Sequence, residues 1–191
     1  DVKGRLAAFG RDRSSLKVLP GIVPYVGASR AEAKVKQNRL DALIEPALGL
    51  SVLSALIGNV DLSGHDLDGP LPELPPSNNS QSRQALFVAA ARRDNLTIRQ
   101  LYQRACTANG HRTIVGTPKD IADDLEKWHR AGAADGFVLI PAWLPGGLED
   151  FIEQVVPILQ KRGLFRTAYE GSTLRENLGL PRPAFRQHQD Q

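Results

Sequence analysis

Apolar positions along this chain follow two spacings, one typical of buried strands and one typical of amphipathic helices. Three short apolar runs predict strands: Lys17 to Gly27 (KVLPGIVPYVG), Arg112 to Gly116 (RTIVG) and Asp135 to Pro141 (DGFVLIP). Because these runs do not alternate with polar residues, we expect both faces of each strand to be buried, as in a parallel sheet. Pro24 lacks a backbone N–H, so we expect it at a strand end or a bulge.

Helical spacing fills the first half of the chain outside the strand. Residues 1–10 are weakly helical and end at Gly10, a plausible C-cap. Ser29, with Glu32 three residues later, forms the capping box that begins a helix. The helical pattern then continues towards Leu56, with interruptions expected at Pro46 and Gly49.

Residues 58–80 change character, with four prolines, three glycines and little periodicity. A loop of this length inside a compact domain is usually functional or a linker. Ser82 to Thr107 is helical again, with a break near Asn95 and a new N-cap at either Asn95 or Thr97. Asn109 and Gly110 predict the turn that follows.

The segment His111 to Trp128 (HRTIVGTPKDIADDLEKW) passes from a strand into a helix through Gly116 and Thr117. Thr117 is the expected N-cap, Pro118 suits the first helical position, and Asp120 can return the capping bond. One interpretation of this junction is purely structural, a tight turn and a helix cap. The other is functional, since the carboxyl end of a strand is the active-site face of an α/β barrel.

After the third apolar run, LPGG leads into another amphipathic helix, from Leu148 to Leu159, which we expect to be kinked or divided at Pro157. Residues 181–191 form a polar tail. The order of elements is the α/β alternation of a parallel sheet. The fold class predicted is therefore α/β, with residues 1–180 in one unit of about three βα repeats.

Three βα repeats cannot close a barrel alone, which predicts further strands from elsewhere. The chain of 191 residues contains no methionine, even at its start, so we expect it to be a piece of a longer protein. Its formal charge of +3 is small and its basic residues are interleaved with acidic ones, so no nucleic-acid partner is expected. No run approaches the length of a membrane span, so no membrane partner is expected either.

The single cysteine, Cys106, cannot form an internal disulfide, and this fits a reducing compartment such as the cytoplasm. On its predicted helix, a buried and inert thiol is a better interpretation than a nucleophile. No metal-ligand spacing, paired carboxylates or Ser/His/Asp set occurs, so no metal site and no catalytic side chain are predicted.

Two long segments together resemble a known family. GHRTIVGTPKDIADDLEKW and GAADGFVLIPAWLPGGLEDFIEQVVPILQKRGLFRTAYEGSTLRENLGL are similar to the C-terminal part of the bacterial luciferase-like flavin monooxygenases. Within that family they most resemble the branch of nitrilotriacetate, dibenzothiophene-sulfone and long-chain alkane monooxygenases. KVLPGIVPYVGASRAEAK and VDLSGHDLDGPLP also match, so the resemblance extends from Asp1 to Leu180.

The resemblance implies a TIM (β/α)8 barrel that uses reduced FMN and dioxygen to oxidise a small organic substrate, with a separate flavin reductase as partner and a homodimer as the assembly. The three apolar runs would be its sixth, seventh and eighth strands, and residues 58–80 an insertion over the pocket. Gly116 and Thr117 are then candidate cofactor contacts. The candidate substrate-pocket residues follow the strand ends or lie in the insertion: Pro24, Tyr25, His65, Pro141 and Trp143.

Two alternatives stay open. The chain can be a non-catalytic piece, or a half-barrel with a structural role only, because the early strands that supply most flavin contacts in the resembled family are not in this sequence. It can also be a related barrel with a deazaflavin cofactor for hydride transfer, although the resemblance of DLDGPLP and YEGSTLRENLGL argues against this.

Overall fold

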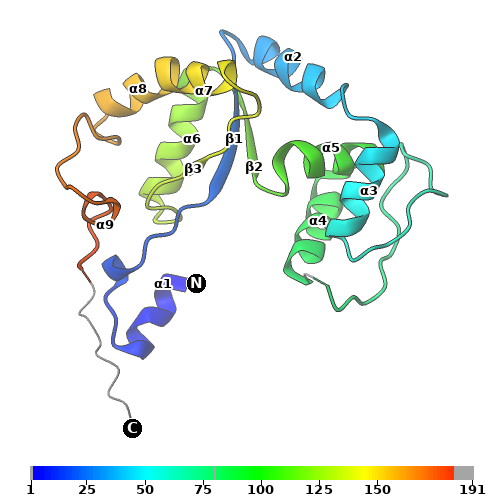
Figure 1. Ribbon diagram of the computed structural model, residues 1–191, viewed down its shortest axis with the longest axis horizontal. Helices are drawn as coiled ribbons and strands as arrows, with labels where there is room; N and C mark the ends of the chain where they lie inside the picture. Colours follow the sequence, from blue (N-terminus) through cyan, green and yellow to red (C-terminus); the bar gives the residue numbers. More distant parts are fainter. Residues whose placement is uncertain (1, 80, 183–191) are drawn as a thin grey trace.

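The computed structural model describes residues 2–79 and 81–182. Three parallel strands, β1 (Gly21–Val26), β2 (Arg112–Gly116) and β3 (Val138–Leu139), form a small sheet surrounded by helices (Figure 1). The helices are α1 (Val2–Arg5), α2 (Arg30–Asp41), α3 (Pro46–Leu56), α4 (Gln81–Asp94), α5 (Ile98–Ala108), α6 (Pro118–Arg130), α7 (Gly146–Asp150), α8 (Val156–Lys161) and α9 (Leu174–Asn177), with 3₁₀ turns η1 (Leu6–Phe9) and η2 (Arg13–Ser15) and the π-helical turn η3 (Phe151–Val155). The α/β class with a parallel sheet is therefore confirmed.

The order of strands in the sheet differs from the predicted one. Three successive strands of a barrel would lie in the order β1-β2-β3, but the observed order is β2-β1-β3. The assignment of these strands as three consecutive neighbours is therefore wrong. The physical reason is visible in the burial of β1, which is the longest strand and is almost completely buried, so it takes the central position and pairs on both sides.

The first strand begins later than predicted, at Gly21 instead of Lys17, and contains Pro24 instead of ending at it. The carbonyls of Pro20 and Ile22 accept hydrogen bonds from the β3 segment. Alternate residues of a strand face the same neighbour, so Pro24 also faces that side. Because β3 pairs only as far as Ile22, no ladder N–H is needed at Pro24.

The third strand is only two residues long, although the whole run Asp135 to Pro141 was expected to be a strand. It is an edge strand, and its Val138 side chain is 50% exposed. The expectation that all three strands are buried on both faces is therefore wrong for β3. The prediction was drawn from an apolar run alone, and such a run does not show whether a strand is central or at an edge.

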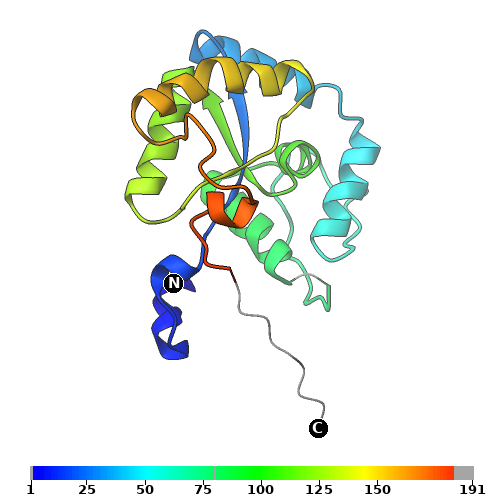
Figure 2. The same cartoon turned by 60° about the vertical axis from the view of Figure 1, so that its left-hand side comes forward.

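Helices cover the sheet on both faces. On one face, side chains of β1 and β2 pack against α6, η3 and α8, with Ile22, Val26 and Ile121 at the centre of this cluster. On the other face, Val23 and Tyr25 meet Ala108 of α5. Figure 2 shows α6 and α8 at one side of the sheet and α3 at the other.

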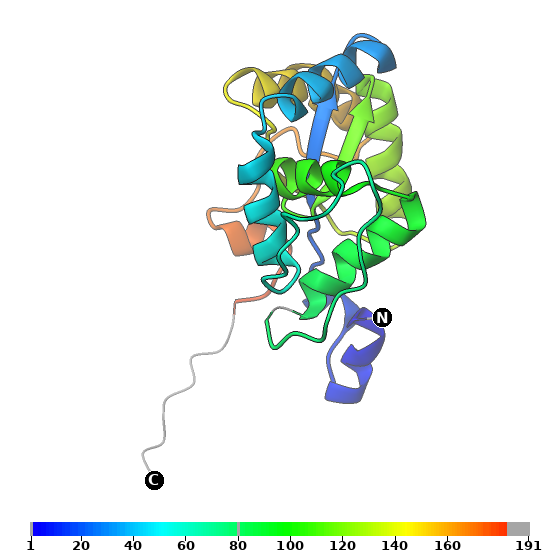
Figure 3. The ribbon, with the colours of Figure 1, turned by 90° about the vertical axis from the view of Figure 1, so that its right-hand side faces the viewer.

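A second apolar cluster lies away from the sheet, among α3, α4 and α5 (Figure 3). The loop of residues 58–79 packs onto it through four leucines, Leu62, Leu67, Leu71 and Leu74. The N–H groups of Ile98 and Arg99 donate to Gly69 and Leu67 of the loop. Residues 58–79 therefore form a loop, as predicted. This loop packs on α3, α4 and α5, which together we call the helical lobe.

The predicted helix starts are confirmed where a local cap was recognised. Ser29 accepts a hydrogen bond from the N–H of Glu32, and both Thr97 and Thr117 form complete capping boxes. Of the two alternatives at the second helix, Thr97 is the N-cap, and Asn95 has a positive φ of 52°.

Of the predicted helix breaks, the one at Gly49 is wrong. Gly49 lies inside α3 without interrupting it, because the absent side chain lets Tyr102 pack against the helix backbone. The predicted division of the last long helix at Pro157 is confirmed, since the π-helical turn η3 ends at Val155 and Pro157 lies in the first turn of α8. Proline has no N–H to donate, so it fits the point where the hydrogen-bond pattern changes.

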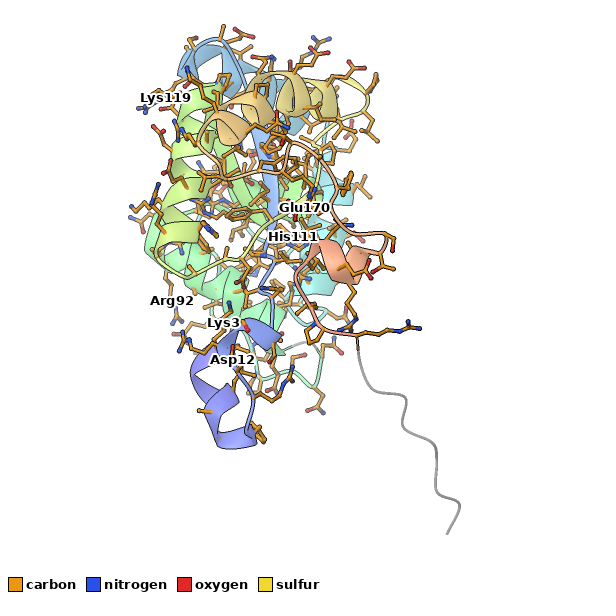
Figure 4. All side chains as sticks on the ribbon, turned by 90° about the vertical axis from the view of Figure 1, so that its left-hand side faces the viewer. Lys3, Asp12, Arg92, His111, Lys119 and Glu170 are labelled. Carbon is orange, nitrogen blue, oxygen red and sulfur yellow. The ribbon has the colours of Figure 1, made fainter. Side chains whose placement is uncertain are left out.

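The N-terminal segment is hydrogen-bonded to Asp135, which precedes β3 at the amino ends of the parallel strands. Asp135 accepts hydrogen bonds from Nζ of Lys3 at 2.6 Å and from the N–H of Val18 at 2.8 Å. Gly10 ends η1 in the left-handed conformation, as predicted. Figure 4 shows Lys3 and Asp12 at one end of the molecule and Lys119, at the start of α6, at the other. Residues 183–191 of the predicted tail lie outside the described residues.

Candidate functional site

The three strands are parallel, so their carboxyl ends lie at one edge of the sheet, close to the start of α2 and to α7 (Figure 3). The N–H of Gly27 donates to the carbonyl of Gly116 across this edge at 3.1 Å. A Cβ at Gly27 would lie 2.5 Å from the backbone nitrogen of Ala33, and one at Gly116 would lie 2.9 Å from Cβ of Asp120. Both helices therefore begin directly against the strand ends.

A carboxylate closes the start of α6. Asp120 accepts from the N–H of Thr117 at 3.0 Å and from its hydroxyl at 2.8 Å. Arg30, at the start of α2, donates to both carboxylate oxygens of Asp120, at 3.0 and 2.5 Å. The Arg30 guanidinium, followed by the Thr117 donors, holds the pKa of Asp120 well below its usual range.

This geometry limits what Gly116 and Thr117 can do. The donor groups of Thr117 are taken by Asp120, so they are not free to bind a phosphate. These two residues therefore do not fit a flavin phosphate. Their contact with any other part of a flavin stays a prediction.

Aromatic side chains meet at the same edge. Tyr25, from β1, is fully buried, and its ring lies 5.8 Å from that of Trp143 at an angle of 46°. Trp143 follows Pro141 in the segment after β3 and is half-buried. A Cβ at Gly146 would lie only 3.0 Å from Nε1 of Trp143, so the glycines of LPGG let the indole lie flat against α7. The structure therefore brings three predicted pocket residues, Tyr25, Pro141 and Trp143, to one edge.

A lysine that was not predicted from the sequence lies beside this aromatic pair. Nζ of Lys36 donates to the carbonyl of Val26 at 2.8 Å and to Asp150 at 2.9 Å, and it lies 6.0 Å from the centre of the Trp143 ring. Burial opposes its charge, but the hydrogen bond and charge of Asp150 outweigh this and raise the pKa of Lys36. Its i,i+4 spacing from Glu32 was a visible signal, whereas the contact with Asp150 was not.

His65 is not part of this edge. It is exposed on the loop of residues 58–79, which packs on α4 and α5, and its backbone N–H donates to Leu62. Its assignment to a substrate pocket stays a prediction. His111 precedes β2, at the opposite end of that strand from Thr117, and Figure 4 shows it far from Lys119.

Other chemistry in the described residues is limited. No group of three or more His, Cys, Asp or Glu side chains in residues 2–79 and 81–182 is arranged to hold a metal ion. Burial raises the pKa of the Cys106 thiol, which agrees with an inert cysteine on α5. Among the helices that the structure describes, none combines the length and the apolar character needed to span a bilayer. The edge with Tyr25, Trp143 and Lys36 is therefore the candidate functional site, and its half-buried indole suits a flat or apolar ligand.

Known proteins share both the sequence and the fold. The chain is 56% identical over 184 residues to nitrilotriacetate monooxygenase component A of Aminobacter aminovorans, a match of 96% of this chain and 41% of that protein. It is 38% identical to the dibenzothiophene-sulfone monooxygenase of Rhodococcus erythropolis, over 95% of this chain and 41% of that protein. The chain thus spans about two fifths of the length of these relatives. No family model matches it.

Solved structures agree with the sequence matches. The crystal structure of DmoA from Hyphomicrobium sulfonivorans superposes with a TM-score of 0.76 at 30% identity, over 93% of this chain and 37% of that one. A riboflavin lyase solved with modified FMN and riboflavin gives a TM-score of 0.75 at 29% identity, over 97% of this chain and 40% of that one. By sequence and fold, the chain is similar over nearly its whole length to one part of the luciferase-like flavin-dependent monooxygenases, in the branch of the nitrilotriacetate, dibenzothiophene-sulfone and long-chain alkane enzymes.

Proposed function

We propose that this chain forms part of a flavin-dependent monooxygenase that uses reduced FMN and dioxygen to oxidise a small organic substrate. The observation that carries the proposal is the match over nearly the whole chain to a nitrilotriacetate monooxygenase at 56% identity. The structural neighbour that was solved with a modified FMN supports FMN as the cofactor. A flavin reductase that delivers the reduced cofactor and a homodimeric assembly belong to the same proposal.

Reduced FMN, when bound, is the group that reacts with dioxygen. The chain's own residues therefore need only bind and orient the cofactor and the substrate and exclude water. Trp143 offers an indole face for the flavin ring or an apolar substrate, and Tyr25 supports that indole from behind. Lys36 fixes the end of β1 to α7 through Val26 and Asp150, which keeps the edge rigid. The phosphate is held elsewhere in this proposal, because Asp120 occupies the start of α6.

The test is a chimera in which residues 2–182 replace the matching segment of the Aminobacter aminovorans enzyme. We expect the chimera to bind reduced FMN and to oxidise nitrilotriacetate when a flavin reductase is supplied. Trp143→Ala should weaken binding of flavin or substrate about tenfold, the equivalent of ~1.4 kcal/mol of lost ring contact. Trp128→Ala is the matched control, because Trp128 lies on α6 against Arg112.

A folded chimera that binds no reduced FMN would refute the proposal. It would favour the alternative that the chain has a structural role only. The 191-residue chain alone is also titrated with oxidised and reduced FMN, and binding is followed by flavin fluorescence and by apparent size. This titration shows whether the chain binds flavin without the rest of the chimera. Binding by the chain alone would show that this chain itself carries flavin contacts, and binding by the chimera only would place most of them outside this chain.

A further inference from the structure

The last carbonyl of β1 accepts its hydrogen bond from a lysine and not from a neighbouring strand. On the β3 side of β1, the carbonyl of Ile22 accepts from the N–H of Ile140 at 2.9 Å. The two-residue repeat of a strand turns the Val26 carbonyl to the same side, but β3 pairs only as far as Ile22. Val26 is 1% exposed, so its carbonyl needs a partner within the protein. Nζ of Lys36 supplies this bond at 2.8 Å.

The same ammonium group is surrounded by acceptors of this chain. A lysine has three N–H donors. One goes to Val26 and a second to Asp150 of α7 at 2.9 Å, while Glu32, one turn earlier on α2, lies 3.5 Å away. Burial acts to lower the pKa of Lys36, but the hydrogen bond and charge of Asp150, followed by those of Glu32, outweigh burial and raise this pKa. Lys36 is therefore a fixed cation whose three donors are directed at groups of this chain.

Trp143 lies beside this fixed charge. Nζ of Lys36 is 6.0 Å from the centre of its ring, at the outer limit of a cation–π contact. The indole also packs on α7, where a Cβ at Gly147 would be 3.2 Å from Cδ2 of the ring. Asp150 belongs to the same helix, so the ammonium group contacts both the indole and the helix on which the indole lies. Loss of the ammonium group would free α7 to move away from the end of β1 and the indole to tilt.

We propose that Lys36 is a positioning residue whose ammonium group fixes the indole of Trp143 at the carboxyl edge of the sheet, and that it acts on a bound ligand through this indole instead of binding the ligand itself. The part of the proposal that concerns a ligand rests on the proposed function. The part that concerns the indole does not, because it involves only residues of this chain.

The first experiment follows the indole in the 191-residue chain. Its two tryptophans give two indole N–H signals in a two-dimensional ¹H–¹⁵N spectrum, and Trp128→Phe assigns them. Lys36→Met keeps the shape of the side chain and removes its charge, so we expect it to move the Trp143 signal and to leave that of Trp128 in place. Lys36→Arg keeps the charge and changes the shape, so it should move the Trp143 signal less. Lys119→Met is the matched control and should move neither signal, because Lys119 also pairs with an aspartate but does so on its own helix.

A Trp143 signal that Lys36→Met leaves in place would overturn the proposal. A displacement with arginine that equals or exceeds the displacement with methionine would also overturn it, because the shape of Lys36 and not its charge would then decide the position of the indole. If Lys36→Met does not fold, as judged by loss of the Trp128 signal, Asp150→Asn takes its place, since it removes the charge that holds the ammonium group. Asp150→Asn should then move the Trp143 signal, and the absence of a displacement would contradict the proposal.

The second experiment separates positioning from direct contact with a ligand, in the chimera described above. Lys36→Met should weaken binding of reduced FMN or of nitrilotriacetate, but by less than the loss of about tenfold expected for Trp143→Ala. In the Trp143→Ala background, Lys36→Met should have no further effect, because its effect passes through the indole. Equal effects in the two backgrounds, including none in either, would overturn the proposal. Failure of the chimera to bind flavin would refute the proposed function and leave the result of the first experiment unaffected.

Discussion

Gly49 provides a sharp test of the packing of the helical lobe. It lies in α3, where a Cβ would be 2.4 Å from Cδ2 of Tyr102, far inside contact distance. Tyr102 cannot give way easily, because it is 2% exposed and its hydroxyl accepts from Arg99 at 3.1 Å. Gly49→Ala therefore forces either the ring or the helix to move.

Two effects of opposite sign decide how much Gly49→Ala changes the stability of the chain. Alanine is the better helix former by about 1 kcal/mol. Overpacking a core costs about 1–3 kcal/mol, and a contact this short lies at the upper end of that range. The net loss of stability is then about 2 kcal/mol, which lowers the melting temperature by about 4–8 °C for a chain of this length.

The assay is thermal and urea unfolding followed by circular dichroism, with Gly4→Ala as the matched control. A Cβ at Gly4, in α1, has no atom within 4 Å, so there only the gain in helix propensity acts, and we expect equal or slightly higher stability. A Gly49→Ala variant as stable as the parent chain would show that the Tyr102 ring does not pack on α3 as described.

Three further outcomes follow from contacts already described. Thr117→Ala should cost about 1 kcal/mol in urea unfolding through the lost capping box, and Thr173→Ala, the cap of the short exposed α9, should cost less; equal losses would contradict the assigned caps. Burial acts to raise the pKa of Asp135, but the hydrogen bonds from Lys3 and Val18 outweigh burial and lower this pKa. The contribution of Asp135 to stability is therefore present above the pKa of the unfolded state, about 3.9, and is lost as the pH falls through the pKa of the folded state. Asp135→Asn should therefore lower the urea midpoint at pH 7 and make little difference near pH 2, and a constant difference at both would refute this. Cys106 is half-buried and burial raises its pKa, so it should react more slowly with a disulfide reagent at pH 7 than in urea, and equal rates would contradict this.

Local signals explain which elements were predictable from the sequence. The caps at Ser29, Thr97 and Thr117 each depend on a partner three residues away, so the residues that form them are visible together. The turn at Asn109 was also predictable, because asparagine readily takes the left-handed conformation, which this residue adopts. The cap of the helix after β2 was predicted correctly because the bonds between Thr117 and Asp120 are local, whereas the contact of Arg30 with Asp120, from 90 residues away, was not visible.

Contacts between distant segments were not visible in that way. The central position of β1 depends on pairing with segments about 90 and 117 residues away along the chain. The partner of Lys36, Asp150, is 114 residues away, and the packing of Gly49 depends on Tyr102 in another helix. In the candidate site, Tyr25, Pro141 and Trp143 were chosen from strand ends and lie together, whereas His65 was assigned by resemblance and lies on a loop of the helical lobe.

The π-helical turn η3 limits how the chain length can vary between α7 and α8. Phe151 and Val155 of this turn and Leu159 of α8 all face the core beside α6. Deletion of one residue within η3 would restore an ordinary α-helix and leave α8 in nearly its present orientation, because a π turn holds about one residue more than an α turn. Leu159 would then stay in the core. A second deletion would have no such extra residue to remove and would rotate everything beyond it by about 100°, which takes Leu159 out of the core.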